Sequence, residues 1–532
     1  MRLSRRQAFG AALAGTGTAL VPAPALGTAA SNAPGWRRGF DNQRICDLGD
    51  GRFLNPLLAG DHPDPAILKD GPDYYMTFSS FDSYPGITIW HSRDLVNWQP
   101  RKAALNKNIG SVWAVSLEKH DGRYFLYIPV KAQPNSIFVI WADHIDGPWS
   151  DPIDLKLHDH IDPCHAVGED GSRWLFLSGG DRIRLAEDGL STVGQVEHVY
   201  DPWRYPDDWD VEGFSPEGPK IHRHGQWFYM ITAVGGTAGP PTGHMVIAAR
   251  SRSIHGPWEH CPHNPLVRTT SLDQKWWSRG HASLVEAPDG SWWSIYHGFE
   301  NSYWTLGRQA LLDPIEWTSD GWFRMKGGDL SQPIAKPRGG VAVPHGQPLS
   351  DDFSKPLQLG RKWNFFKPSP NEHQRARVEG GALLLKASGK APVNSSPLLL
   401  IAGDTAYQFE CDIEIAPGGV AGLVLFYDEK LYCGLGFDEK RFVTHQYGIE
   451  RGRPANSYGR RMRMRVTNNR HIVAFHTSGD GGRTWQRFDR GMEVSGYHHN
   501  VRGGFLMLRP GLYSAGEGEG EARFRDFRFR AL

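Results

Sequence analysis

A phrase that recurs about every fifty residues constrains the fold of this chain more than any other feature. Each copy has a short start, an apolar run, a tight turn and then an aromatic-rich run. The five copies start at Asp64, Ala114, Asp162, Glu217 and His281, so that successive starts lie 50, 48, 55 and 64 residues apart. Repetition of one supersecondary unit at such a period is typical of solenoids and propellers.

Each copy reads as a β-hairpin. An Asp-Gly pair stands at the turn in four of the five copies, and a His-Gly pair takes its place in the fourth copy along the chain. This is the strongest short-range hairpin signal. Between the hairpins a second phrase recurs and ends at Trp98, Trp149 and Trp258, which indicates an outer strand in each unit. Four strands per unit and five units predict a five-bladed β-propeller over residues 45–335.

The chain changes character after this region. Residues 330–350 are rich in proline and glycine and have no hydrophobic period, which is typical of a linker. The segments beyond them alternate apolar and polar residues with a period of two, and they predict an antiparallel β-sandwich over residues 350–532. The whole chain is therefore expected to be all-β. Its five cysteines show neither metal-type spacing nor a disulfide framework; Cys411 and Cys433 could pair across the C-terminal sheet, but buried free thiols are favoured.

The first thirty residues read as an export signal. Arg2, Arg5 and Arg6 precede a mild apolar run that ends in small residues and prolines, and the phrase "SRRQAF" resembles a twin-arginine signal. The run is too short and too rich in glycine and threonine to span a membrane. We therefore expect a periplasmic or secreted protein.

The charge balance narrows the class of partner. The chain carries 59 basic and 58 acidic residues, a formal net charge of +1, which argues against nucleic acid or an anionic membrane as partner. Its 20 tryptophans suit a cleft in which sugar rings stack on aromatic side chains.

The propeller geometry predicts a site. The first strand of every blade lines the central channel, so the starts of the five copies converge. Three of these starts are the carboxylates Asp64, Asp162 and Glu217, and a fourth is His281. Each acid alone could cap a turn, but three acids at equivalent positions indicate chemistry.

Two facing carboxyl groups suit the hydrolysis of an acetal. One must be protonated to donate to the leaving oxygen, and the other must be ionised to activate water. A third carboxylate close by raises the pKa of the acid. We expect Glu217 to be the acid, proline-braced Asp64 the base and Asp162 the group that tunes the acid. Glu212 is the alternative acid, although it precedes the start of its repeat and would lie on the connecting loop.

These residues also carry a family resemblance. The segments "NPLLAGDHPDPAI", "IDPCH", "SPEGPKIHRHGQWFYMITAVGGT", "GHASLVEAPDGSWW" and "LGRQALLDPIEW" resemble glycoside hydrolase family 43. The resemblance covers about residues 53–330 and implies an inverting five-bladed enzyme of the β-xylosidase or α-L-arabinofuranosidase type. It places the family's base, pKa modulator and acid on Asp64, Asp162 and Glu217. It also implies that His281 and Arg308 line the pocket, with Arg308 reaching sugar hydroxyls.

The resemblance carries further expectations and two departures. Some members hold a calcium ion or an ordered water near the equivalent of His281, and no redox or organic cofactor is expected. The C-terminal part looks like the concanavalin A-like β-sandwich of β-xylosidase-type members, where it either helps to close the pocket or acts as a stabilising or weak carbohydrate-binding module. The family's Trp-Ala-Pro at the second blade is "SVWAVSL" here, so that Trp113 is kept as a stacking platform without the proline. The serine expected after the catalytic Asp-Pro is Ala66.

These observations predict an exported, inverting exo-glycosidase that removes β-xylosyl or α-L-arabinofuranosyl units from hemicellulose-derived oligosaccharides. The choice between the two sugars and the oligomeric state stay open. One alternative is a retaining five-bladed hydrolase of fructosides, although its typical Arg-Asp-Pro motif does not occur in the sequence. The other alternative is a propeller that binds carbohydrate without cleaving it.

Overall fold

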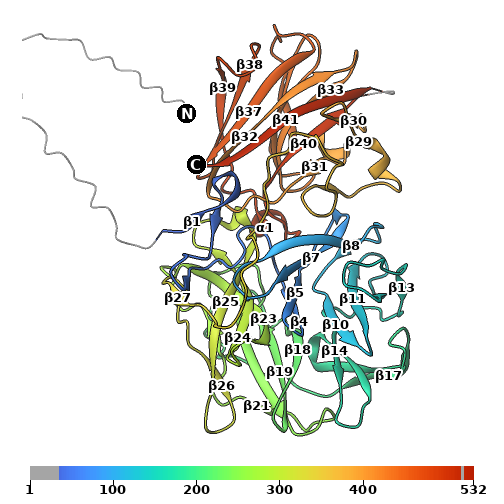
Figure 1. The fold of residues 1–532 in the computed structure, drawn as a ribbon, viewed down its shortest axis with the longest axis vertical. Helices are drawn as coiled ribbons and strands as arrows, with labels where there is room; N and C mark the ends of the chain where they lie inside the picture. The colour runs from blue at the N-terminus through green and yellow to red at the C-terminus, as the bar shows by residue number, and fades with distance from the viewer. Residues whose placement is uncertain (1–34, 517–519) are drawn as a thin grey trace, which may run out of the picture. The chain divides into compact units, whose positions relative to one another are not determined.

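The computed structural model describes residues 35–516 and 520–532 (Figure 1). Within these residues, five antiparallel sheets follow one another along the chain, one for each copy of the repeat. They confirm the five-bladed β-propeller. The predicted export signal over residues 1–30 lies outside the described residues. No helix of the described part of the chain is long and apolar enough to cross a membrane.

In each blade four strands form an antiparallel meander in which each strand pairs with the next, and blades II and IV each carry a short additional strand that pairs with a middle strand of the meander. Blade I comprises β4 (Ala66–Asp70), β5 (Asp73–Thr77), β7 (Gly86–Ser92) and β8 (Gln99–Leu105). Blade II comprises β9 (Ser111–Val112), β10 (Ser116–His120), β11 (Arg123–Lys131), β12 (Ser136–Ala142) and β13 (Ile153–Asp154). Blade III comprises β14 (Cys164–Val167), β15 (Arg173–Leu177), β16 (Asp181–Leu185) and β17 (Thr192–His198). Blade IV comprises β18 (Glu217–His224), β19 (Trp227–Val234), β20 (Met245–Ser251), β21 (Glu259–His260) and β22 (Val267–Arg268). Blade V comprises β23 (Trp276–Glu286), β24 (Trp292–Glu300), β25 (Arg308–Trp317) and β26 (Phe323–Met325).

The turn and tryptophan signals of the sequence lie where they were expected. In all five inner hairpins the turn glycine has a positive φ, between 59° and 81°, which glycine adopts without steric cost. Trp98, Trp149 and Trp258 each come shortly before the outermost strand of their blade, namely β8, β13 and β21. Trp98 is fully buried. These local signals therefore mark the inner and outer edges of the blades.

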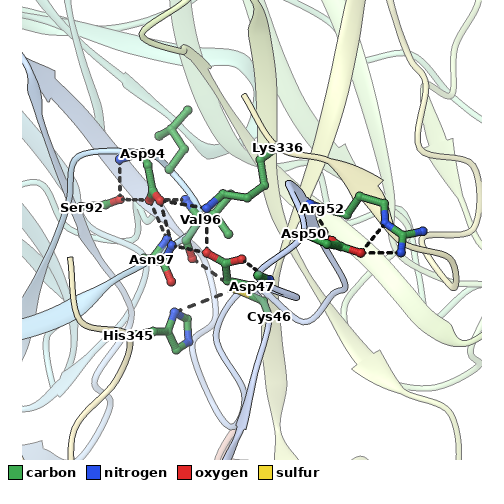
Figure 2. A network of polar contacts seen from close by, with 12 residues as sticks. Cys46, Asp47, Asp50, Arg52, Ser92, Asp94, Val96, Asn97, Lys336 and His345 are labelled. Carbon is green, nitrogen blue, oxygen red and sulfur yellow. Dashed lines mark hydrogen bonds and ion pairs between the residues drawn. The ribbon is translucent and has the colours of Figure 1, made fainter. Parts of the chain in front are cut away.

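The ring is closed by contacts between its two chain ends (Figure 2). Four short strands belong to this region: β1 (Arg37–Arg38), β2 (Arg44–Ile45), β3 (Arg52–Phe53) and β27 (Ile334–Ala335). Strand β3, before the first blade, pairs with β27, after the fifth. Beside this pair, Nζ of Lys336 lies 2.7 Å from Oδ2 of Asp47 and 3.2 Å from Oδ2 of Asp94, and the side chain of Asn97 donates to both aspartates. The ring is thus held by a strand pair and a partly buried charge network.

The C-terminal part is a two-sheet β-sandwich. One sheet comprises β36 (Ile449–Gly452), β35 (Phe442–Gln446), β34 (Tyr432–Phe437), β33 (Val420–Phe426), β40 (Arg509–Ala515), β31 (Leu398–Leu399), β28 (Asn364–Phe366) and β6 (Ser83–Tyr84) in spatial order. The other comprises β29 (Ala376–Glu379), β30 (Ala382–Lys386), β41 (Glu521–Ala531), β32 (Ala406–Ile415), β37 (Arg461–Asn469), β38 (Ile472–Ser478) and β39 (Gln486–Glu493). The helical segments among the described residues are the 3-10 turns η1 (Phe40–Asn42), η2 (Ser178–Gly180), η3 (Trp304–Leu306), η4 (Glu372–Arg375) and η5 (Pro392–Asn394) and the short helix α1 (His499–Arg502).

The sandwich and the first blade share structure. Strand β6 arises within blade I but pairs with β28 of the sandwich, so that Tyr84 lies opposite Phe365. Phe81, from the same loop, belongs to the hydrophobic core of the sandwich. This sharing positions the loop between β5 and β7 beside both the propeller channel and the sandwich. All five cysteines are free and buried, as favoured from the sequence.

Candidate active site

The structure brings together the four polar residues that were expected to converge. Asp64 and Asp162 each stand two residues before the first strand of their blade, Glu217 is the first residue of β18, and His281 lies within β23. Oδ2 of Asp162 accepts a hydrogen bond from the backbone N–H of Gly218 at 2.9 Å, directly beside Glu217. Nδ1 of His281 lies 3.4 Å from Oδ1 of Asp64. Residues from four blades therefore form one site at the channel.

Asp64 is held as a buried carboxylate. Its Oδ1 accepts a hydrogen bond from Nη1 of Arg308 at 2.8 Å, and its Oδ2 accepts one from Oγ of Ser79 at 2.6 Å. Burial by itself would raise the pKa of Asp64, but Arg308, His281 and His297 together outweigh it and hold this pKa well below its ordinary value, with Arg308 contributing the largest part of the lowering. Asp64 is therefore ionised at neutral pH.

Glu217 has the opposite environment. Burial, followed by the negative charge of Asp64, raises its pKa to about 8. Its side chain remains 21% exposed, so the carboxyl group can still meet a ligand. Two nearby carboxyl groups with pKa values pushed in opposite directions are the pattern that identifies a base and an acid. At neutral pH, Asp64 can accept a proton and Glu217 can donate one.

Asp162 is the third carboxyl group of the site, and it is also buried. Besides the Gly218 amide, its Oδ2 accepts a hydrogen bond from Oγ of Ser178 at 3.3 Å. Burial, and then the charges of Glu217 and Asp64, raise the pKa of Asp162 well above its ordinary value. The charge of Glu217 is thus one cause of the raised pKa of Asp162, so the ionisation of the two carboxyl groups is linked.

The backbone at these positions is strained. Asp64, Asp162 and His281 have φ values of 57°, 54° and 60°, in the left-handed region that residues other than glycine rarely adopt. Gly218 also has a positive φ, 63°, and a Cβ atom there would lie 2.7–2.8 Å from three atoms of the His281 ring. Left-handed conformations at three blade starts cost free energy and are typical of functional sites.

Several residues of the site were missed from the sequence. Ser79 binds the proposed base, and the fully buried His244 and His297 lie between Asp64 and Glu217. The two histidines stand outside the first strands of the blades, so the repeat did not mark them. Their ring contacts depend on the folded channel.

Arg308 and Trp113 line one wall together with an aromatic side chain from the sandwich. The ring of Phe505 lies 5.5 Å from that of Trp113, and Cζ of Arg308 lies 5.2 Å from the centre of the Phe505 ring. The ring of Phe81 is also stacked with that of Phe505, with ring centres 6.3 Å apart. The sandwich therefore contributes Phe505 to the site, a contact between segments almost 400 residues apart that no local pattern indicated.

Glu212, the alternative acid, lies close enough to Glu217 for its charge to raise the pKa of that residue. It is exposed on the loop before β18, and its Oε2 accepts a hydrogen bond from the backbone N–H of Ala238 at 2.8 Å. No contact joins its carboxylate to Asp64 or Asp162 among the described residues.

The residues around His281 do not fit a calcium ion. Nε2 of His281 is buried, and it has no hydrogen-bond partner in the part of the chain that the structure describes, so it is open to a ligand. Calcium, however, takes six to eight oxygen ligands. In residues 35–516 and 520–532, no group of three or more histidine, cysteine, aspartate or glutamate side chains is placed to hold a metal ion. No step of the reaction is therefore assigned to calcium.

Comparisons with known proteins match both parts of the chain. The model of glycosyl hydrolases family 43 matches residues 53–323, and that of the β-xylosidase C-terminal concanavalin A-like domain matches residues 350–530. Similar relatives include the non-reducing end α-L-arabinofuranosidase BoGH43B of Bacteroides ovatus, 29% identical over 74% of this chain and 77% of that one. Xylosidase/arabinosidase 43B of Humicola insolens is also 29% identical, over 68% of this chain and 70% of the relative.

Solved structures give the same match over most of the chain. The GH43 protein BlXynB of Bacillus licheniformis superposes with a TM-score of 0.80 at 26% identity, over 90% of this chain and 100% of that one. The xylan β-1,4-xylosidase of Bacillus halodurans superposes with a TM-score of 0.79 at 26% identity, over 90% and 99% of the two chains. The similarity thus extends across the propeller and the sandwich.

Proposed function

Because this chain belongs to glycosyl hydrolases family 43, we propose that it removes single β-xylosyl or α-L-arabinofuranosyl units from the non-reducing ends of hemicellulose-derived oligosaccharides, with inversion at the anomeric carbon. The observation that carries the assignment of roles is the opposed pKa shift of two neighbouring carboxyl groups, lowered at Asp64 and raised to about 8 at Glu217.

The reaction needs only proton transfers. Asp64, ionised and oriented by Arg308, takes a proton from a water molecule as its oxygen attacks the anomeric carbon. Glu217 gives its proton to the glycosidic oxygen as the bond to the sugar breaks. Burial and the negative charge of Asp64 keep Glu217 protonated at neutral pH. We assign the tuning of this acid to Asp162, whose carboxylate oxygen accepts a hydrogen bond from the backbone N–H of Gly218 directly beside it. Because the water enters on the face opposite the leaving group, the anomeric configuration inverts. Acetal hydrolysis involves no oxidation, so no redox or organic cofactor is required.

The wall formed by Trp113, Arg308 and Phe505 supports action at chain ends. Trp113 offers an aromatic surface to a sugar, and the guanidinium group of Arg308 offers donors to its hydroxyl groups. The ring of Phe505 is stacked on that of His499, with ring centres 3.9 Å apart. Phe505 enters from the sandwich and narrows the site beside Trp113, which favours short substrates. The two relatives named for arabinofuranosidase or xylosidase activity support a pentose as the sugar. We further propose export by the twin-arginine-type signal, since plant oligosaccharides of this kind are met outside the cytoplasm.

The test measures release of p-nitrophenol from the β-D-xyloside and the α-L-arabinofuranoside. We expect the wild type to hydrolyse at least one of them and Asp64→Asn to lose at least about 100-fold in kcat, because an activated leaving group still needs an activated water. Asp70→Asn is the matched control, at the far end of the same first strand and outside the site. The anomer that appears first by NMR tests inversion.

Two outcomes would refute the proposal. Full activity of Asp64→Asn would exclude Asp64 as the base. A folded wild type that binds pentosides without cleaving either of them would favour the propeller that binds carbohydrate without hydrolysis.

A further inference from the structure

We propose that His244, held by His297, is a positioning residue for the acid. It keeps an N–H directed at Oε1 of Glu217, which orients the carboxyl group and stabilises the negative charge that develops there as the proton leaves. This inference rests on the proposed role of Glu217 as the acid.

The two histidines connect the acid to the base. Nδ1 of His297 lies 3.1 Å from the backbone nitrogen of Asp64, and Nε2 of His297 lies 3.2 Å from Nδ1 of His244. Nε2 of His244 in turn lies 3.2 Å from Oε1 of Glu217. Both rings are fully buried, with centres 5.1 Å apart. A continuous row of polar contacts therefore runs from Asp64 to Glu217.

The direction in which these hydrogen bonds donate is set by the contact between the backbone of Asp64 and His297. A backbone N–H can only donate, so Nδ1 of His297 accepts, and the single proton of this neutral ring is on Nε2. Oδ1 of Asp64 also lies 3.2 Å from that Nδ1, but this pair is not aligned for a hydrogen bond. The Asp64 amide, by contrast, makes no other hydrogen bond in the described part of the chain and would be left unpaired if Nδ1 carried the proton. Burial lowers the pKa of both histidines to about 3, which keeps each of them neutral.

The proton of His244 is fixed in the same way. Nε2–H of His297 donates to Nδ1 of His244, with the hydroxyl of Thr237 as a second neighbour at 3.3 Å. His244 therefore carries its proton on Nε2, the nitrogen that faces Glu217. The structure thus assigns a donor, not an acceptor, to the acid.

A small movement of the Glu217 side chain would turn its contact with His244 into a well-aligned hydrogen bond. Among the described residues, Nε2 of His244 has no well-aligned hydrogen-bond partner, although it is buried and lies 3.2 Å from Oε1 of Glu217. The last torsion of a glutamate is soft, so a small rotation of the carboxyl group aligns the bond. Catalytic hydrogen bonds are often poorly aligned without substrate and tighten in the complex. Because the bond is strongest when Glu217 is ionised, it stabilises the transition state more than the ground state.

The absence of a side chain at Gly280 leaves room for the ring of His244. A Cβ atom at Gly280, on the neighbouring strand β23, would lie 2.4–2.5 Å from three ring atoms of His244. The backbone of Gly280 does not have a positive φ, so alanine is tolerated by the backbone and excluded only by the ring. Gly280→Ala therefore offers a second way to displace His244 without changing it.

The experiment compares His244→Met with His244→Gln on two substrates of the preferred sugar, a p-nitrophenyl glycoside and an unactivated alkyl glycoside. Methionine has no donor, whereas the glutamine amide places an N–H near the position of Nε2. We expect His244→Met to lower kcat on the alkyl glycoside by about 10- to 100-fold and on the p-nitrophenyl glycoside by less than about threefold, since only a poor leaving group needs the acid. We expect glutamine to recover most of this loss and Gly280→Ala to reproduce the loss.

The pH profile gives a second readout. Loss of a donor to the ionised form raises the pKa of Glu217, so the alkaline limb of kcat/KM on the alkyl glycoside should move to higher pH in His244→Met. The charged and titratable groups that face Glu217 are unchanged in all variants: Asp64, Asp162, Glu212 and Arg308.

Each other outcome has a definite meaning. Equal losses on both substrates in both His244 variants, or a wild-type pattern in His244→Met, would overturn the inference. If Glu217→Gln hydrolyses the alkyl glycoside at the wild-type rate, the proposed function itself fails. If Glu217→Gln is inactive on this substrate while His244→Met is unaffected, only the role of His244 fails. Unfolding temperatures measured in parallel identify any variant that does not fold.

Discussion

Glu217→Gln should abolish hydrolysis of unactivated substrates and yet stabilise the fold at alkaline pH. In the unfolded chain a glutamate ionises near its ordinary pKa of 4.5, whereas in the fold Glu217 holds its proton up to about pH 8. Between these values the folded state binds more protons than the unfolded state. The stability of the wild type must therefore fall as the pH rises through this window. Glutamine has nearly the same shape and does not titrate, so the variant lacks this decline.

The size of the effect follows from the pKa shift. A rise from 4.5 to about 8 corresponds to about 5 kcal/mol if Glu217 titrated alone. Asp162 shares the same repulsion, and the Glu217 side chain is 21% exposed, so we expect a smaller gain of about 1–3 kcal/mol. With about 2.1 cal/mol/K of unfolding entropy per residue, a chain of this size changes its Tm by about 1 °C per kcal/mol.

Differential scanning calorimetry at about pH 5 and about pH 9 measures this gain. The Tm of Glu217→Gln relative to wild type should rise by about 1–3 °C between the two pH values. Glu187→Gln is the matched control, because this glutamate is exposed before β17 and its charge is not among those that act on Glu217, so its Tm difference should show no such rise. A Glu217→Gln difference that does not change with pH, or that becomes more negative at high pH, would refute the reasoning.

Three further changes test other parts of the structure. Arg308→Gln removes the charge that keeps Asp64 ionised, so the acid limb of kcat/KM should move up by at least about one pH unit; an unmoved limb would contradict the role of this ion pair. Phe505→Ala removes the aromatic contact to Trp113 and should raise KM by about 3- to 10-fold with less change in kcat, whereas an unchanged KM would place Phe505 outside the substrate site. Lys336→Met leaves two partly buried aspartates of the ring closure without their cation. It should lower the free energy of unfolding by about 1–3 kcal/mol, seen as a lower Tm with unchanged kcat, and a Tm equal to wild type would show that the network is not needed for closure.

The repeat in the sequence was sufficient to predict the five-bladed propeller. Hairpin turns and strand alternation depend on residues close together in the chain, so the blades and their first strands followed from local patterns. Because the blades are equivalent, their starts must converge at the channel. The repeat alone therefore predicted the grouping of Asp64, Asp162, Glu217 and His281. The calcium expectation near His281 came only from the resemblance, and the residues present do not fit it.

Other properties of the site depended on the tertiary structure. The directions of the pKa shifts at Asp64 and Glu217 are set by burial and by the position of Arg308, which is 244 residues away from Asp64 along the chain. The ring contacts of His244 and the approach of Phe505 also join distant segments. The sequence by itself determined that the starts of the repeats meet at the channel, because repeat equivalence is a local and periodic property. Only the fold decided which carboxyl group is ionised and what surrounds it, because electrostatic and packing free energies depend on distances through space.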